Sequence, residues 1–159
     1  MSVCRVIGVI ALAILGSGCG GSGSPGGSTS PTESPAPAEL VSRPQTVVLI
    51  RSLQAAGLEP RFVELMESRS YPFVSVRAVR LQVDGENVHA FEFATTAAAE
   101  AEALGISADG HVVGTAQVSW ISDPHFYRSD RLIVLYVGRS ERITNALRQV
   151  VGPQFAGRT

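Results

Sequence analysis

The chain has 159 residues, and its 13 basic side chains, all of them arginine, nearly balance 14 acidic ones, which gives a formal net charge of −1. A near-neutral chain without basic clusters argues against nucleic acid as a partner, because phosphate binding draws on concentrated lysine and arginine. The 2 cysteines, Cys4 and Cys19, both precede the part predicted to fold. That part therefore cannot hold a disulfide, a cysteine metal site or a thiol nucleophile.

The N-terminal residues have the form of a secretory signal. Residues 1–5 carry one positive charge, residues 6–15 are apolar with Gly8 as the one interruption, and three small residues then lead to Cys19. A helix that spans a bilayer needs about 20 apolar residues, so this run is too short to span. The pattern instead predicts a signal peptide that is cleaved.

The segment Leu15-Gly16-Ser17-Gly18-Cys19 resembles the lipidation box of bacterial lipoproteins, with the leucine one position further from the cysteine than usual. The resemblance implies a signal peptide over residues 1–18 and a diacylglycerol on Cys19 as the first mature residue. Two acyl chains make membrane attachment effectively permanent. The expected location is the cell envelope, with the chain lipid-anchored to the outer face of the cytoplasmic membrane or to another envelope membrane.

Residues 19–43 are predicted to be a tether. They are rich in glycine, serine and proline, and such a composition offers too little apolar surface to offset chain entropy, so the tether is expected to stay disordered. A coil of about 24 residues has a root-mean-square span of roughly 25–30 Å. The tether should therefore hold the following domain away from the lipid headgroups.

Residues 44–157 are predicted to form a single domain, which begins with a helix over residues 46–56 that ends at Gly57. A short strand is predicted over residues 60–65. Val79, Leu81 and Val83 then alternate with other residues before Asp84-Gly85 and a second alternating run over residues 88–93. Asp-Gly between alternating runs predicts a β-hairpin.

The second half repeats this order of elements. A helix over residues 97–104 follows a threonine cap, and residues 107–110 form a turn. A strand is predicted over residues 112–121, and Asp123-Pro124 begins the connection to a continuous apolar strand over residues 132–137. The last helix has its apolar face at positions 143, 146, 147, 150 and 151, behind a serine cap at Ser140 and before Gly152-Pro153.

The order helix, hairpin, helix, hairpin, helix indicates an α+β fold. We expect an antiparallel sheet of four to five strands with the helices on one face, and a ferredoxin-like arrangement is one option. Residues 81–93 and 124–138 resemble segments of small uncharacterised bacterial lipoproteins, and the likeness covers most of residues 45–157. That resemblance implies an envelope location and no known activity, with no catalytic residues to assign.

One segment, residues 120–128, concentrates side chains of the types enriched at binding hot spots. The candidate partner-binding residues are Trp120, His125, Phe126, Tyr127 and Arg128. Two interpretations stay open. The segment can form a surface for an envelope protein or ligand, or Trp120 and Phe126 can close the end of the core while Arg128 pairs with an aspartate.

No catalytic or metal site is predicted. His89, His111 and His125 lack the close spacing that places two zinc ligands on one face, and the serine-hydrolase, zinc-protease and phosphate-loop motifs do not occur. We therefore expect a lipid-anchored binding or accessory module, not an enzyme, without a cofactor. The alternatives are a small hydrolase or metal-dependent enzyme using His125 and nearby carboxylates, which a deep pocket joining His125 to another histidine would favour, and a purely structural subunit.

Overall fold

The computed structural model describes residues 38–71 and 74–158. The predicted signal peptide, Cys19 and the tether up to residue 37 lie outside the described residues. The helices of the described part are α1 (Pro44–Ala55), α2 (Thr96–Leu104) and α3 (Glu141–Val150), with short 3-10 turns η1 (Ala38–Leu40) and η2 (Ser68–Ser70). The strands are β1 (Pro60–Leu65), β2 (Ala78–Val83), β3 (Glu86–Glu92), β4 (Val112–Val113), β5 (Ala116–Gln117), β6 (Pro124–Ser129), β7 (Leu132–Val137) and β8 (Gln154–Gly157). Within the described residues, no helix is long and apolar enough to cross a membrane.

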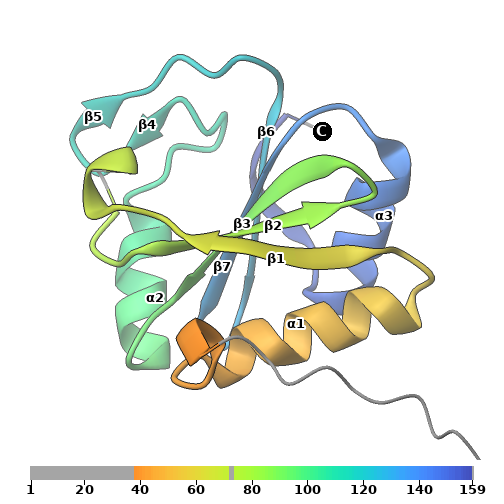
Figure 1. The fold of residues 1–159 in the computed structure, drawn as a ribbon. Helices are drawn as coiled ribbons and strands as arrows, with labels where there is room; N and C mark the ends of the chain where they lie inside the picture. Colours follow the sequence, from red (N-terminus) through yellow and green to blue (C-terminus); the bar gives the residue numbers. More distant parts are fainter. Residues whose placement is uncertain (1–37, 72–73, 159) are drawn as a thin grey trace, which may run out of the picture. The chain divides into compact units, whose positions relative to one another are not determined.

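Six of these strands form one antiparallel sheet in the order β1-β2-β3-β7-β6-β8, while β4 and β5 pair in a separate small hairpin (Figure 1). The predicted α+β class with an antiparallel sheet is confirmed, and β1, β2, β3 and β7 lie where the sequence pattern placed them. The main sheet has six strands where four to five were predicted, because β6 and β8 both belong to it.

The ferredoxin-like option is wrong. β3, α2 and β6 form a crossover with β7 inserted antiparallel between the two strands, as that fold requires. A ferredoxin-like sheet would then place its last strand beside β3, whereas β8 pairs with β6. The hairpin partner β2 already occupies the free edge of β3, so β8 extends the opposite end of the sheet.

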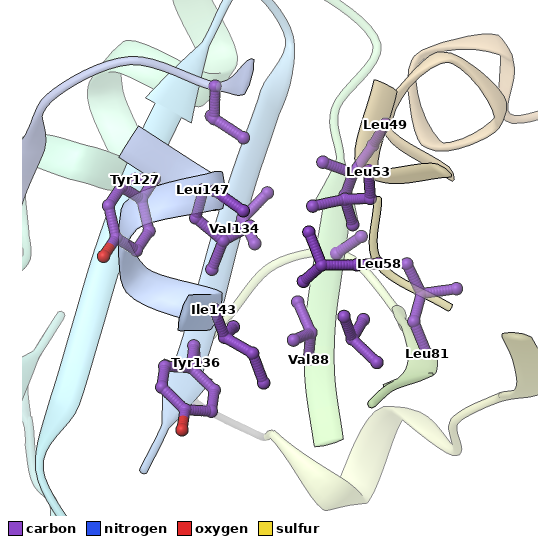
Figure 2. Close-up of a cluster of buried hydrophobic side chains, with 14 of the residues drawn as sticks. Leu49, Leu53, Leu58, Leu81, Val88, Tyr127, Val134, Tyr136, Ile143 and Leu147 are labelled. Atoms are coloured by element: carbon purple, nitrogen blue, oxygen red, sulfur yellow. The ribbon is translucent and has the colours of Figure 1, made fainter. Parts of the chain in front are cut away.

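The larger of two cores lies between one face of the sheet and helices α1 and α3 (Figure 2). Side chains alternate across a strand, so Leu81 and its neighbours two positions away in β2 point to this face. They meet Leu49 and Leu53 from α1, with Ile143 and Leu147 from α3. Burying such a side chain contributes roughly 1.5–3 kcal/mol, so this packing fixes both helices on the sheet.

The second core lies on the opposite face of the sheet and includes Ala99 of α2. Phe91, Phe126 and Ile133 supply the sheet side of this core. The prediction that all helices share one face is therefore wrong for α2. An alanine-rich helix with a single fully buried residue carries little amphipathic pattern, so its sequence does not reveal which face it covers.

Two stretches differ from the predicted elements. The strand predicted over residues 112–121 is reduced to β4 and β5, because Gly114, with φ of 60°, turns the chain between them. The connection predicted to begin at Asp123-Pro124 is instead the start of β6. Pro124 is the first residue of that strand, a position where its missing N–H is tolerated.

Helix α1 begins against the end of β3. The carboxylate of Glu92, which is buried, accepts hydrogen bonds from the backbone N–H groups of Gln45 and Thr46 at 3.2 and 2.9 Å. It also accepts one from the Thr46 hydroxyl at 3.0 Å and lies 3.4 Å from a guanidinium nitrogen of Arg131. A carboxylate at a helix N-terminus satisfies free N–H groups and complements the helix dipole, so Glu92 joins α1 to the sheet.

The other helix ends follow the predicted capping pattern. The Thr95 hydroxyl accepts a hydrogen bond from the Ala98 N–H, and the Ser140 hydroxyl accepts one from the Ile143 N–H. These caps confirm the predicted starts of α2 and α3. Leu40, which the prediction placed in the tether, has only 3% of its surface exposed and packs in the larger core.

Candidate functional site

The predicted partner-binding residues lie mostly in strand β6 and not in a loop. Phe126 and Tyr127 are exposed by only 2% and 0%, and they point into the two cores on opposite faces of the sheet. Neighbouring residues of a strand face opposite sides, so these two cannot form one surface. Their side chains are unavailable to a partner in this fold.

Trp120 and Arg128 lie at separate places on the surface. The Trp120 ring is half-buried, its Nε1–H donates to the Gly110 carbonyl at 2.8 Å, and it meets Phe126 edge-on at 6.0 Å between ring centroids. The Arg128 guanidinium lies 3.0 Å from the Glu100 carboxylate of α2, and not against an aspartate. The five candidates are therefore not brought together, and their joint role as a partner surface stays a prediction.

His125 joins three segments near the edge of the sheet. Its Nδ1 lies 2.9 Å from the side-chain oxygen of Gln154 in β8, and its Nε2 lies 3.1 Å from the carbonyl oxygen of Gly138. The ring also stacks on Tyr136, with the centroids 5.7 Å apart. Both ring nitrogens thus lie within hydrogen-bond distance of protein oxygens, with the donating nitrogen set by the tautomer, so His125 connects β8 to the turn before α3.

A hollow of about 450 Å³ lies beside His125 on the α3 side of the sheet. The Asp123 carboxylate at its edge lies between two guanidinium groups, 3.0 Å from Arg139 and 3.4 Å from Arg158. Arg148 donates to the Asn145 side chain at 3.0 Å. These charged groups pair mainly with one another, and neither His89 nor His111 lines this hollow.

A second pocket, of about 470 Å³, has a different character. It is formed by the turn before residue 72, the β2–β3 hairpin, the end of β7 and the segment that leads from β5 to β6. We call it the His89 pocket. Its lining residues are Ser70, Tyr71, Gly85, Glu86, Asn87, His89, Val118, Ser119, Trp120, Ile121 and Val137.

His89 is the buried polar group of this pocket. It is 8% exposed, and its Nδ1 has no hydrogen-bond partner among the described residues. Burial, together with the neighbouring Arg80 guanidinium, lowers the pKa of His89 to about 4, so the imidazole is neutral at physiological pH. Arg80 lies directly across the ladder on β2 and is held by Glu64 at 3.0 Å.

Aromatic and apolar groups surround the imidazole. The Tyr71 ring meets His89 edge-on at 5.2 Å and Phe91 edge-on at 5.4 Å. Trp120 contributes to another part of the lining, and the neighbouring Ile121 is 100% exposed. A pocket with aromatic walls and a few convergent polar groups is the usual form of a small-molecule site.

Glu86 is the one carboxylate in the lining. Its Oε2 accepts a hydrogen bond from the Tyr136 hydroxyl at 2.6 Å, and the Ser140 N–H donates to that same hydroxyl oxygen at 2.8 Å. Burial and the hydrogen bond to Glu86 raise the pKa of Tyr136 to about 12, so the phenol stays protonated. These hydrogen bonds direct the Glu86 carboxylate toward the start of α3, on the opposite face of the sheet from His89.

The sequence interpretation included Trp120 but missed Tyr71 and His89. One signal for His89 was present in the pattern, because its position has the same parity as Phe91 and Phe93 and therefore faces the same side of the strand. A histidine in an otherwise apolar row is a buried polar group that needs a partner. No such signal marked Tyr71, because its position beside His89 and Phe91 results from contacts between segments that are distant in the sequence.

Comparison with protein-family models, with curated proteins and with solved structures finds no match. The described residues contain no group of three or more histidine, cysteine, aspartate or glutamate side chains that could hold a metal ion.

Proposed function

We propose that this protein is a lipid-anchored binding module of the bacterial cell envelope, and that its domain binds a small ligand in the His89 pocket. The proposal includes membership of the lipoprotein class that its N-terminal segment resembles. Lipid on Cys19 would hold the molecule at the membrane, and the pocket would supply the recognition. One observation carries the binding role: His89 lines a pocket of ligand size, and its buried Nδ1 has no hydrogen-bond partner among the described residues.

The energetic argument begins with that nitrogen. More than nine-tenths of buried polar groups in folded proteins have a hydrogen-bond partner, and leaving one without a partner costs about 1–3 kcal/mol. A buried histidine in the apolar row of β3 is therefore unfavourable for the isolated domain. A ligand that hydrogen-bonds to Nδ1 would recover this free energy, so the missing hydrogen bond would favour ligand binding.

The anchoring half of the proposal rests on the N-terminal sequence alone. It is tested by fractionating cells that express the full chain, a Cys19→Ser variant and a matched Cys4→Ser variant. We expect the wild type and Cys4→Ser proteins in the membrane fraction and Cys19→Ser in the soluble fraction or as an uncleaved precursor. A processed Cys19→Ser protein that stays with the membranes would refute lipid anchoring through this residue.

The binding half is tested through Trp120, the only tryptophan in the chain, which lines the pocket. Its fluorescence should change saturably when a small amphipathic alcohol, cyclohexanol, is titrated into the full-length protein. A His89→Phe variant, which fills the site with an apolar ring of similar shape, should lose most of that response. If cyclohexanol and the neutral sugars tested below all fail to perturb Trp120, the pocket is not a binding site.

The surroundings of His125 do not favour the enzymatic alternative. That alternative depended on His125, but both nitrogens of that ring lie within hydrogen-bond distance of protein oxygens, those of the Gln154 side chain and the Gly138 carbonyl. A general base or metal ligand needs a nitrogen that can reach the reacting group. His125 and His89 also line two separate pockets of the described residues.

A further inference from the structure

We propose that the ligand of the His89 pocket is a neutral sugar, bound through its hydroxyl groups and one apolar face. This inference rests on the proposed binding function and names the chemical class of the ligand. Three features of the pocket carry it: the hydrogen-bonding requirement of His89, the set of polar groups around it, and the apolar walls.

The first feature is the unpartnered nitrogen. A neutral imidazole has one nitrogen that donates and one that accepts a hydrogen bond, and which role Nδ1 takes depends on the tautomer. A hydroxyl group can donate and accept, so it is a suitable partner for either tautomer. A carbonyl or an ammonium group would fit only one of them. The pocket therefore favours a ligand that presents hydroxyl groups at its buried end.

The second feature is the polar lining near the opening. Asn87 offers an amide that both donates and accepts, and Ser70 and Ser119 offer hydroxyl groups. These groups come from three separate segments of the chain. Together with His89 they can bind several hydroxyl groups at once, which a ligand with a single polar end would not exploit.

Charge in the lining favours neither kind of ionic ligand. Glu86 is the one charged side chain among the described lining residues. A neutral His89 cannot form an ion pair with an anion, and the nearby Arg80 guanidinium is already paired with Glu64 at 3.0 Å. A cation would have to compete with the Tyr136 hydroxyl, which already donates to Glu86 at 2.6 Å. An uncharged ligand meets neither obstacle.

The third feature is the apolar part of the wall. Trp120, Tyr71, Ile121 and Val137 provide aromatic and aliphatic surface beside the polar groups. A sugar ring has hydroxyl groups around its edge and C–H groups on its faces, so it can contact both kinds of surface simultaneously. The pocket volume of about 470 Å³ also falls within the range of about 300–1,000 Å³ that is typical of small-molecule sites.

The test compares sugars with cyclohexanol, using Trp120 fluorescence on the full-length protein in detergent. The probes are glucose, mannose and N-acetylglucosamine, each titrated to high millimolar concentration. We expect at least one of these sugars to give a saturable change and to bind more tightly than cyclohexanol. His89→Phe should weaken sugar binding about tenfold, which corresponds to one lost hydrogen bond.

A matched pair of asparagine variants tests the proposal independently, so the test does not depend on the folding of His89→Phe. Asn87→Ala removes an exposed amide of the pocket and should weaken sugar binding about threefold to tenfold. Asn145→Ala removes an exposed amide on α3, in the other hollow, and should leave binding unchanged. If cyclohexanol saturates the site while no sugar does, the sugar proposal is overturned and the binding function stands. Equal effects of the two asparagine variants would also overturn it.

Discussion

Acid is expected to destabilise this domain through His89. Burial and the nearby Arg80 lower the pKa of His89 to about 4 in the folded protein, against an ordinary value of 6.5 in an unfolded chain. Between these two pH values the unfolded chain binds a proton that the folded domain does not bind. The free energy of unfolding should therefore fall as the pH drops from about 6.5 to about 4, and this contribution should stop changing below about 4.

The size of the effect follows from the difference between the two pKa values. One pKa unit corresponds to about 1.4 kcal/mol, so the full loss is about 3 kcal/mol. About two-thirds of that loss, on the order of 2 kcal/mol, should already be present at about pH 5. Typical domains are stable by about 5–15 kcal/mol, so the change is large enough to shift a denaturation midpoint clearly.

Urea unfolding at about pH 7.5 and about pH 5 provides the measurement, with wild type and His89→Phe compared at both values. Carboxylates and the other histidines also titrate in this range, but they are common to both proteins, and their contributions cancel in the comparison. Wild type should lose about 2 kcal/mol more than His89→Phe between the two pH values. Equal losses in the two proteins would refute a buried, neutral His89.

Three further predictions concern residues that hold the fold. Glu92→Ala should lower the free energy of unfolding by about 3 kcal/mol, because it leaves buried N–H groups of α1 and a guanidinium without their partner; a loss below about 1 kcal/mol in urea unfolding would contradict this role. Phe126→Ala should cost about 3–5 kcal/mol, whereas Ile121→Ala, at a fully exposed position, should change stability by about 0.5 kcal/mol or less. Gly157→Ala should destabilise the pairing of β8, because its φ is 99° and an added Cβ would lie 2.0 Å from the Pro124 carbonyl oxygen; a thermal midpoint equal to that of wild type would contradict this.

Local patterns in the sequence predicted most of the fold. The Asp84-Gly85 turn between alternating runs predicted the β2–β3 hairpin, and the cap residues Thr95 and Ser140 predicted the starts of two helices. These signals act within a few residues, so they can be recognised in one sequence. The side of the sheet that α2 covers depends on contacts between distant segments, and no local pattern encodes it.

Strand β6 was missed because its own pattern resembles a loop. It begins with proline after aspartate, a pair typical of turns, and contains His125 and Arg128 among its aromatic residues. Its polar side chains, on both faces of the sheet, find hydrogen-bond partners far away in the sequence. Gln154 contacts His125, and Glu100 binds Arg128. Polar residues that find distant partners are indistinguishable, in the sequence, from polar residues exposed to solvent.

The candidate site could be predicted only in part for the same reason. Trp120 was identified by its residue type, but the groups that join it in the pocket come from segments that lie up to 50 residues earlier and up to 17 residues later in the chain. Aromatic content pointed to residues 120–128 as a unit, and the fold divides them among two cores and separate surface positions. Composition identified residue types that are common at binding sites, and the sheet topology determines which of those side chains lie close together.

The proposed role of His89 connects the stability of the domain to its binding function. An apolar residue at its position would continue the row formed with Phe91 and would need no hydrogen-bond partner, so it would suit an isolated fold better. Natural sequences keep such unfavourable groups mainly where a ligand or reaction needs them. The proposed role therefore requires His89→Phe to be at least as stable as wild type at acidic pH and to bind sugars more weakly. A variant that lost stability at every pH and retained sugar binding would show that the imidazole serves packing alone.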